Sequence, residues 1–181
     1  VIRILGLKFD LGLFKDPFAK KELSALVGST VHREVARQAV RESLVLLKSE
    51  GNVLPLKSTD KIAVVGEHAN NSGLQSGGWS IHWQGQKHSY AGATTLLDGI
   101  HGFAPEAAYQ PMGCTADMQA SKVIAVVGEL PYAEFMGDST KLNLTQTQRK
   151  MITHCKSLGK QVIVVLISGR VMTVTDIINQ S

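Results

Sequence analysis

Three short apolar runs constrain the fold of this chain more than any other feature. They lie at residues 61–65, 122–127 and 161–167, and each opens on one polar residue and is then continuously apolar. A strand that is apolar at successive positions is buried on both faces, as in a parallel sheet covered by helices. A weaker strand is predicted around residues 107–109. The runs therefore predict an α/β fold with a mostly parallel sheet.

Helical segments separate these strands along the chain. Apolar residues at helical spacing predict an amphipathic helix from residue 30 to about residue 50, and another helix spans about 94–102. A third begins at Thr145, where Thr145 and Gln148 form a capping box, and Gly159 suits the position just after its end. The alternation of strands and helices predicts a doubly wound sheet.

Each main strand runs into a loop that contains glycine, at residues 66–68, 128–131 and 168–170. In an open parallel sheet, the loops at the carboxyl ends of the strands share one edge, and ligands bind there. The sequence therefore places a candidate site at this edge.

Composition sets the broad class of protein. With 181 residues, of which 44% are hydrophobic, the chain is long enough for one sizeable core. The net charge is +4, but the basic residues are scattered and form no run, so we predict no nucleic-acid partner. The longest apolar stretch, residues 162–167, is far too short to cross a bilayer, so we predict no membrane span.

Motifs for metals, cofactors and other catalytic classes are missing. Cys114 and Cys155 lie far apart and form no CxxC pair, so we predict neither a zinc site nor a disulfide framework. The six histidines show no HxxxH or HExxH spacing, so no metal site is predicted. Because GxGxxG, Walker and GxSxG motifs do not occur, we predict no cofactor, and a nucleotide-binding function has little support.

Both tryptophans of the chain, Trp79 and Trp83, lie four residues apart in a segment flanked by glycines. In a helix or a strand, this spacing places both indoles on about the same side. Paired indoles suit a sugar, because its C–H face packs on an aromatic ring and the indole N–H binds a hydroxyl. Large aromatic residues also serve as core anchors, which is the alternative. The polar neighbours Ser80, His82 and Gln84 favour an exposed loop.

A loop with three carboxylates and two aromatic residues, at residues 128–138, follows the second main strand. Glycoside hydrolysis needs one carboxyl that stays protonated and donates to the leaving oxygen. Apolar surroundings favour the protonated form of a carboxyl, and Glu134 lies between Tyr132 and Phe135. A glutamate in a loop is ordinarily exposed and inert, so this pattern makes Glu134 a candidate only.

Taken together, these segments resemble family 3 glycoside hydrolases, in the branch of β-glucosidases and plant-type exo-β-glucanases. Residues 32–34, 44–48, 54–56 and 62–69 resemble the start of the family's second domain, and the matching motifs further along are 76–79, 83–85, 128–134 with 137–138, and 166–170. Residues 1–14 resemble the end of a barrel domain and its linker. Ser76 departs from the pattern, since many relatives have cysteine there.

The resemblance implies a fold, a reaction and roles for individual residues. It implies an incomplete three-layer α/β sandwich at residues 30–181, preceded at residues 1–29 by the end and linker of a barrel domain. It further implies retaining hydrolysis of β-glucosidic bonds from non-reducing ends, with Glu134 as the general acid/base. Trp79 and Trp83 match the aromatic residues that border the sugar subsites.

The same resemblance defines the expected partners and leaves one alternative. The expected partners are a β-glucoside or β-glucan oligosaccharide and the barrel domain of the same enzyme, which carries the catalytic aspartate. The chain alone is therefore expected to be inactive, since a retaining glycosidase needs both carboxyls. A secreted or periplasmic location is implied by the family only. The alternative is a non-catalytic carbohydrate-binding or structural α/β domain.

Overall fold

The computed structural model describes residues 1–180, which divide into two compact units, Val1–Leu47 and a second unit that starts at Lys48. The first unit contains α1 (Ile2–Asp10), the 3-10 helix η1 (Lys21–Leu26) and α2 (Thr30–Ser43), and no residue of these helices is buried. The predicted boundary between residues 29 and 30 stays a prediction.

Helix α2 is shorter than the sequence suggested. It ends at Ser43, and Leu44 already has an extended backbone with φ −67° and ψ 133°. The expected continuation to about residue 50 was wrong, because residues 44–50 form no helix. Four successive apolar residues, 44–47, fit helical and extended spacing equally well, so periodicity alone did not separate the two conformations.

The second unit is built on a four-stranded sheet in the order β2-β1-β3-β4. Its strands are β1 (Ile62–Val65), β2 (Ala108–Gln110), β3 (Lys122–Gly128) and β4 (Gln161–Ile167). Every neighbouring pair is parallel, and β3 and β4 pair along their whole length. The parallel sheet predicted from the three apolar runs is confirmed, as is the weaker strand, which forms one edge.

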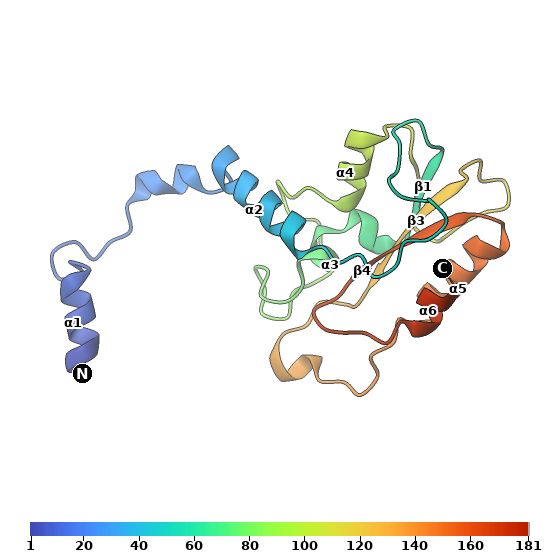
Figure 1. Cartoon of the computed structure of the whole chain (residues 1–181). Coiled ribbons are helices and arrows are strands. Elements are labelled where there is room, and N and C mark those ends of the chain that lie inside the picture. The colour runs from blue at the N-terminus through green and yellow to red at the C-terminus, as the bar shows by residue number, and fades with distance from the viewer. Residues whose placement is uncertain (181) are drawn as a thin grey trace. The chain divides into compact units, whose positions relative to one another are not determined.

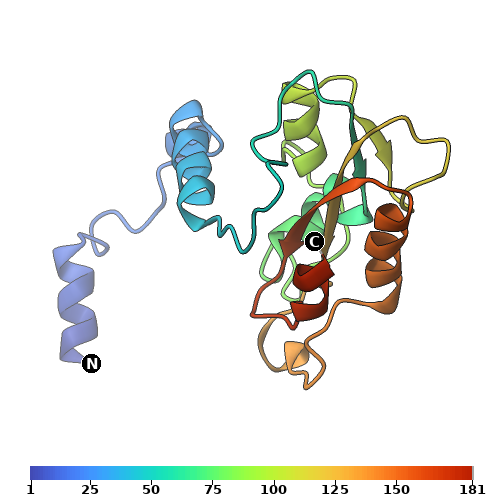
Figure 2. The same ribbon diagram turned by 45° about the vertical axis from the view of Figure 1, so that its right-hand side comes forward.

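Helices cover both faces of this sheet, as Figures 1 and 2 show. Along β3, Val123, Ala125 and Val127 belong to one core cluster, while Ile124 and Val126 belong to the other. Successive side chains of a strand point to opposite faces, so each continuous apolar run supplies both cores. One core includes residues of α5 (Gln146–Ser157) and α6 (Thr175–Gln180), and the other includes residues of α4 (Leu96–Phe103). The predicted α/β sandwich is thus confirmed.

The cysteine prediction was wrong. Cys114 and Cys155 form a disulfide, although 41 residues separate them. Cys114 follows the edge strand β2, and Cys155 lies in the last turns of α5. Both are buried in the same core cluster, on the face of the sheet that α5 covers. Sequence distance did not reveal this proximity, because the doubly wound topology brings the two segments together.

The start of α5 follows the predicted chemistry. The side chain of Thr145 accepts a hydrogen bond from the amide of Gln148, and the Gln148 side chain accepts one from the amide of Thr145, which completes the capping box. Gly159 follows the helix with φ +72°, which favours glycine. The short helices η2 (Glu67–Asn70), α3 (Ser72–Ser76) and η3 (Glu134–Gly137) lie in the loops.

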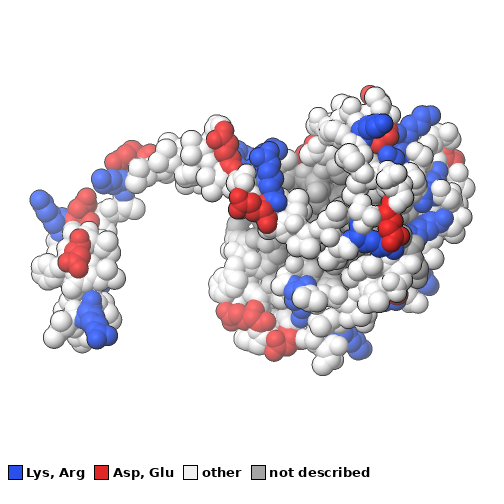
Figure 3. Space-filling view, in the orientation of Figure 1, with Lys and Arg blue, Asp and Glu red and all other residues white. Residues whose placement is uncertain are grey.

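The surface carries mixed charge, and acidic and basic side chains are interspersed on the face seen in Figure 3. Among residues 1–180, no helix is long and apolar enough to cross a membrane. The same residues contain no group of three or more His, Cys, Asp or Glu side chains that is suited to a metal ion.

Candidate functional site

The predicted site residues lie on two loops that follow neighbouring strands. The loop after β1 carries Trp79 and Trp83, and the loop after β3 carries Glu134. From β1 and β3 the chain proceeds to opposite sides of the sheet, so the carboxyl ends of these two strands flank the point where the topology reverses. In doubly wound sheets this is the point where ligands bind.

Hydrogen bonds join these two loops. Nε2 of His68 lies 3.0 Å from the carbonyl oxygen of Glu129. Because a carbonyl only accepts, Nε2 donates this hydrogen bond, and the buried Nδ1 has no hydrogen-bond partner among the described residues. Farther along, the side-chain amide of Gln84 bonds the backbone of Ala133 in both directions. The loop after β1 is therefore bonded to the loop after β3 at two places, one near the ends of the strands and one farther along the loops.

Glu134 is exposed and begins the short helix η3. Among residues 1–180, its carboxylate has no hydrogen-bond or ion-pair partner. Its backbone is left-handed, with φ +51°, which is uncommon for a residue other than glycine. Such a conformation costs on the order of 1–3 kcal/mol and persists where the surroundings hold it. The described residues do not form the apolar enclosure expected around Glu134.

Aromatic rings from both loops form one cluster beside Glu134. Trp79 and Trp83 are 68% and 43% exposed, which excludes the core-anchor alternative. Their ring centroids are 6.4 Å apart, although the segment that carries them is neither a helix nor a strand. The ring of Phe135, the residue after Glu134, lies 6.0 Å from that of Trp83 in an edge-on arrangement. Trp79, Trp83 and Phe135 therefore make an exposed aromatic cluster.

Glu129, which sequence reasoning left without a role, is the best-connected carboxylate of the site. Its oxygens accept hydrogen bonds from the Ser168 hydroxyl at 2.9 Å, from the Tyr132 hydroxyl at 3.2 Å and from Nε of Arg170 at 2.9 Å. Burial by itself raises the pKa of Glu129, but the hydrogen bonds from Arg170 and Ser168 and the charge of Arg170 outweigh it, so the pKa is lowered. Glu129 is thus ionised at neutral pH, and both of its carboxylate oxygens accept hydrogen bonds.

Arg170 connects Glu129 to the far end of η3. Its Nη1 donates to the carbonyl oxygen of Gly137 at 2.5 Å, and its guanidinium carbon lies 4.3 Å from the centroid of the Tyr132 ring. The sequence did contain a signal for this network. A glutamate after one strand and an arginine after the next, with β3 and β4 adjacent, fits a charge pair across two neighbouring strand ends.

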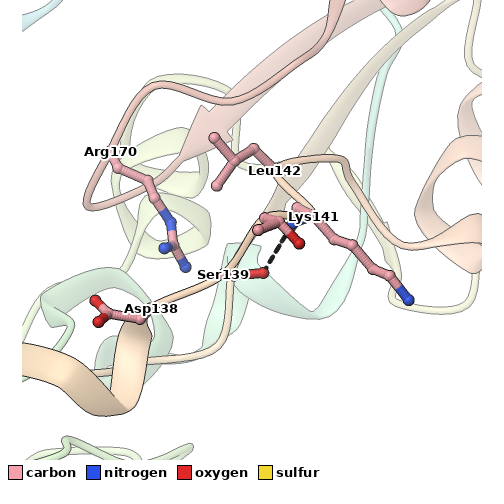
Figure 4. Close-up of a pocket in the computed structure, with 6 residues that line it drawn as sticks. Asp138, Ser139, Lys141, Leu142 and Arg170 are labelled. Carbon is pink, nitrogen blue, oxygen red and sulfur yellow. Dashed lines mark hydrogen bonds between the residues drawn. The ribbon is translucent and has the colours of Figure 1, made fainter.

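Two hollows lie near the carboxyl edge of the sheet. The first, of about 830 Å³, is open and is drawn in Figure 4, where the guanidinium of Arg170 extends toward the segment that carries Asp138. Its lining is Asp138, Ser139, Thr140, Lys141, Leu142 and Arg170. The second, of about 750 Å³, is lined in part by Glu129, Tyr132 and Gln148. Glu134, Trp79 and Trp83 line neither hollow.

Comparison with known proteins identifies the family. The family model of the glycosyl hydrolase family 3 C-terminal domain matches residues 44–181. The periplasmic beta-glucosidase of Salmonella typhimurium is 34% identical over 206 residues, which cover 92% of this chain and 27% of that protein. The lysosomal beta glucosidase of Dictyostelium discoideum is 29% identical over 195 residues, covering 94% of this chain and 24% of that protein.

Solved structures agree with the sequence relatives. The exo-1,3/1,4-beta-glucanase ExoP of a Pseudoalteromonas species superposes with a TM-score of 0.88 at 32% identity, covering 97% of this chain and 24% of that one. The chain thus spans about a quarter of the length of the curated relatives it matches. The resemblance seen in its motifs is confirmed, and the chain belongs to glycosyl hydrolase family 3, whose C-terminal domain its residues 44–181 match.

Proposed function

We propose that this chain is part of a retaining β-glucosidase or exo-β-glucanase, to which it supplies the general acid/base Glu134. The observation that carries the proposal is the position of Glu134. It is an exposed, unpaired carboxyl among the described residues, beside three exposed aromatic rings, at the ligand-binding edge of the sheet. The names of the relatives, beta-glucosidases and an exo-1,3/1,4-beta-glucanase, support the same reaction.

In this mechanism the carboxyl of Glu134 acts twice. It first donates its proton to the glycosidic oxygen, while a carboxylate nucleophile of the barrel domain attacks the anomeric carbon and the bond to the leaving group breaks. The ionised Glu134 then takes a proton from water, whose oxygen displaces the enzyme carboxylate. The two carboxyls must lie about 5–5.5 Å apart for this sequence. Glu129 is unsuited to the role of the nucleophile, because its oxygens accept hydrogen bonds from Arg170, Ser168 and Tyr132.

The aromatic cluster is proposed to bind the sugar. Trp79 and Trp83 present exposed ring faces on which the apolar C–H face of a pyranose packs. The substrate is accordingly a β-glucoside or β-glucan oligosaccharide, and the barrel domain of the same enzyme is the structural partner. This assignment of Trp79 and Trp83 is independent of the assignment of Glu134.

We further propose a secreted or periplasmic location. The buried disulfide between Cys114 and Cys155 supports it, because disulfides persist in oxidising compartments. The printed name of the Salmonella relative, a periplasmic enzyme, is consistent with the same location.

The acid/base role is tested with the Glu134→Ala variant of the full-length enzyme. We expect kcat/KM for an alkyl β-glucoside to fall by about 10²-fold or more, because its leaving group needs a proton. With 2,4-dinitrophenyl β-glucoside the loss is expected to stay below about tenfold, since this leaving group departs as the anion. The Glu106→Ala variant, which removes an exposed carboxyl of the turn before β2, is the control and should match the parent.

Equal losses on both substrates argue against proton donation by Glu134. Full activity of the Glu134→Ala variant on both substrates favours the alternative, a non-catalytic carbohydrate-binding or structural domain.

A further inference from the structure

We propose that Gln84 is a positioning residue that sets the orientation of Glu134, an inference that rests on the acid/base role of Glu134. Gln84 follows Trp83 in the loop after β1 and is half-buried. Its Nε2 donates to the carbonyl oxygen of Ala133 at 3.2 Å, and its Oε1 accepts from the amide of Ala133 at 2.9 Å. One side chain thus satisfies both backbone groups of the residue before Glu134.

These two bonds act on the backbone rotation that orients Glu134. The carbonyl of Ala133 and the amide nitrogen of Glu134 belong to one planar peptide group. Holding the Ala133 oxygen therefore fixes the plane from which the φ angle of Glu134, +51°, is measured. Ala133 itself is buried at 5% exposure, so its own position is fixed by packing.

The other end of the short helix is held independently. Nη1 of Arg170 bonds the carbonyl oxygen of Gly137, three residues after Glu134. Glu134 thus lies between two anchored backbone positions, while its own carboxylate has no partner among residues 1–180. These anchored positions help to offset the cost of a left-handed glutamate.

Gln84 also links the acid to the aromatic cluster. It is adjacent to Trp83, and the ring of Phe135, on the other side of Glu134, contacts the ring of Trp83. The bidentate bond therefore sets the distance between the carboxyl that donates the proton and the rings proposed to hold the sugar. A misplacement of about 1 Å at such a group costs about 10²-fold in rate, so loss of the bond is expected to affect proton donation first.

The experiment uses the Gln84→Met variant of the full-length enzyme, which keeps the length of the side chain and removes both hydrogen bonds. We expect kcat/KM for an alkyl β-glucoside to fall by about tenfold or more, with less than about a threefold change for 2,4-dinitrophenyl β-glucoside. Across a series of aryl β-glucosides, the plot of log kcat/KM against the pKa of the leaving group is expected to become steeper, as it does when proton donation weakens.

A matched control is Gln75→Met. Gln75 is also half-buried, and its Nε2 donates to the carbonyl oxygens of His68 and Ala69 at 2.6 and 3.0 Å, with no bond to the loop of Glu134. This variant is expected to lower the melting temperature and to leave the leaving-group slope unchanged.

Two outcomes overturn the proposal. A Gln84→Met variant that loses activity equally on both substrates, or on neither, shows that Gln84 does not position the acid. The Glu134→Ala variant, measured in parallel, separates the two failures. If Glu134→Ala discriminates between the substrates and Gln84→Met does not, only the role of Gln84 is wrong. If Glu134→Ala does not discriminate either, the acid/base role is wrong and the role of Gln84 falls with it.

Discussion

Nη2 of Arg170 lies 2.7 Å from Oε1 of Glu129, and this ion pair joins the loops that follow the neighbouring strands β4 and β3. The two side chains are 26% and 14% exposed, so solvent screens the pair only in part. Because Arg170 also bonds the carbonyl of Gly137, the pair supports the backbone of the loop that carries Glu134.

Glu129→Gln is expected to destabilise the domain at neutral pH by about 2–3 kcal/mol. This value lies below the ~3–5 kcal/mol that is typical when a fully buried pair loses one partner, since the side chain of Arg170 is 26% exposed to solvent. The lowered pKa of Glu129 gives the sign of the pH dependence. Its contribution is fully present above the ordinary pKa of 4.5 and is lost as the pH falls through the lower folded-state pKa. The deficit of the variant, measured by urea unfolding, should therefore shrink on acidification below pH 4.5.

An exposed ion pair provides the comparison. Lys87 and Glu67 form a salt bridge in which the side chains are 56% and 48% exposed. Glu67→Gln is expected to change the free energy of unfolding by less than about 1 kcal/mol at any pH. A Glu129→Gln deficit that is equally small, or that grows as the pH falls, contradicts the role given to the Glu129–Arg170 pair.

The disulfide gives a second prediction. Its two cysteines are buried, and the closed loop of about 41 residues places the expected contribution at about 3–4 kcal/mol. The Cys114→Ala/Cys155→Ala double variant should lose about that much stability in urea. The parent protein treated with a reductant should lose a similar amount, and the double variant should not respond to reductant. Equal unfolding of reduced and oxidised parent protein would falsify the stabilising role.

Much of the fold was predictable, because it follows from local patterns. Continuous apolar runs identified β1, β3 and β4, because a strand that packs against helices on both faces is apolar at successive positions. Residues 162–167 of β4 are only partly buried. The capping box at Thr145 fixed the start of α5 to the residue. The position of the candidate loops at the carboxyl edge also followed, since parallel strands bring their ends to one edge.

What could not be predicted depends on contacts between distant segments. The Cys114–Cys155 disulfide, the bidentate bond from Gln84 to Ala133 and the left-handed backbone of Glu134 leave no local pattern in the sequence. The Glu129–Arg170 pair was predictable in part. Both residues follow strands that the sequence identifies, but the order of the strands is needed to see that their loops are adjacent.

Gly78 gives a third prediction, because it packs against the loop of Glu134. A Cβ atom at this position would lie 2.0 Å from the carbonyl oxygen of Tyr132, which is backbone and has little freedom to move. Gly78→Ala is expected to destabilise the domain by about 1–3 kcal/mol. In contrast, a Cβ at Gly99, in α4, meets nothing within 4 Å, and Gly99→Ala should stabilise by about 0.4–1 kcal/mol. Thermal melts of both variants provide the measurement. Opposite shifts of the melting temperature would show that the loss in Gly78→Ala comes from packing, whereas equal shifts would show a general effect of alanine.

Trp83 allows a test of sugar binding that is separate from proton donation. In the full-length enzyme, Trp83→Ala is expected to raise KM for a β-glucan oligosaccharide by about tenfold, or about 1.4 kcal/mol, because a stacking face is lost. Trp83→Phe keeps an aromatic face and should retain most of the affinity. An unchanged KM in Trp83→Ala would show that the exposed ring binds no sugar.

The isolated 181-residue chain is expected to hydrolyse no β-glucoside. A retaining glycosidase needs two carboxyls about 5–5.5 Å apart, one as nucleophile and one as acid/base. Glu134 is the proposed acid/base, and the carboxylate oxygens of Glu129, in the same loop, are bound by Arg170, Ser168 and Tyr132. Incubation of the purified chain with 2,4-dinitrophenyl β-glucoside should release the phenolate no faster than buffer does. Release of the phenolate faster than in buffer would reveal a nucleophile within these residues.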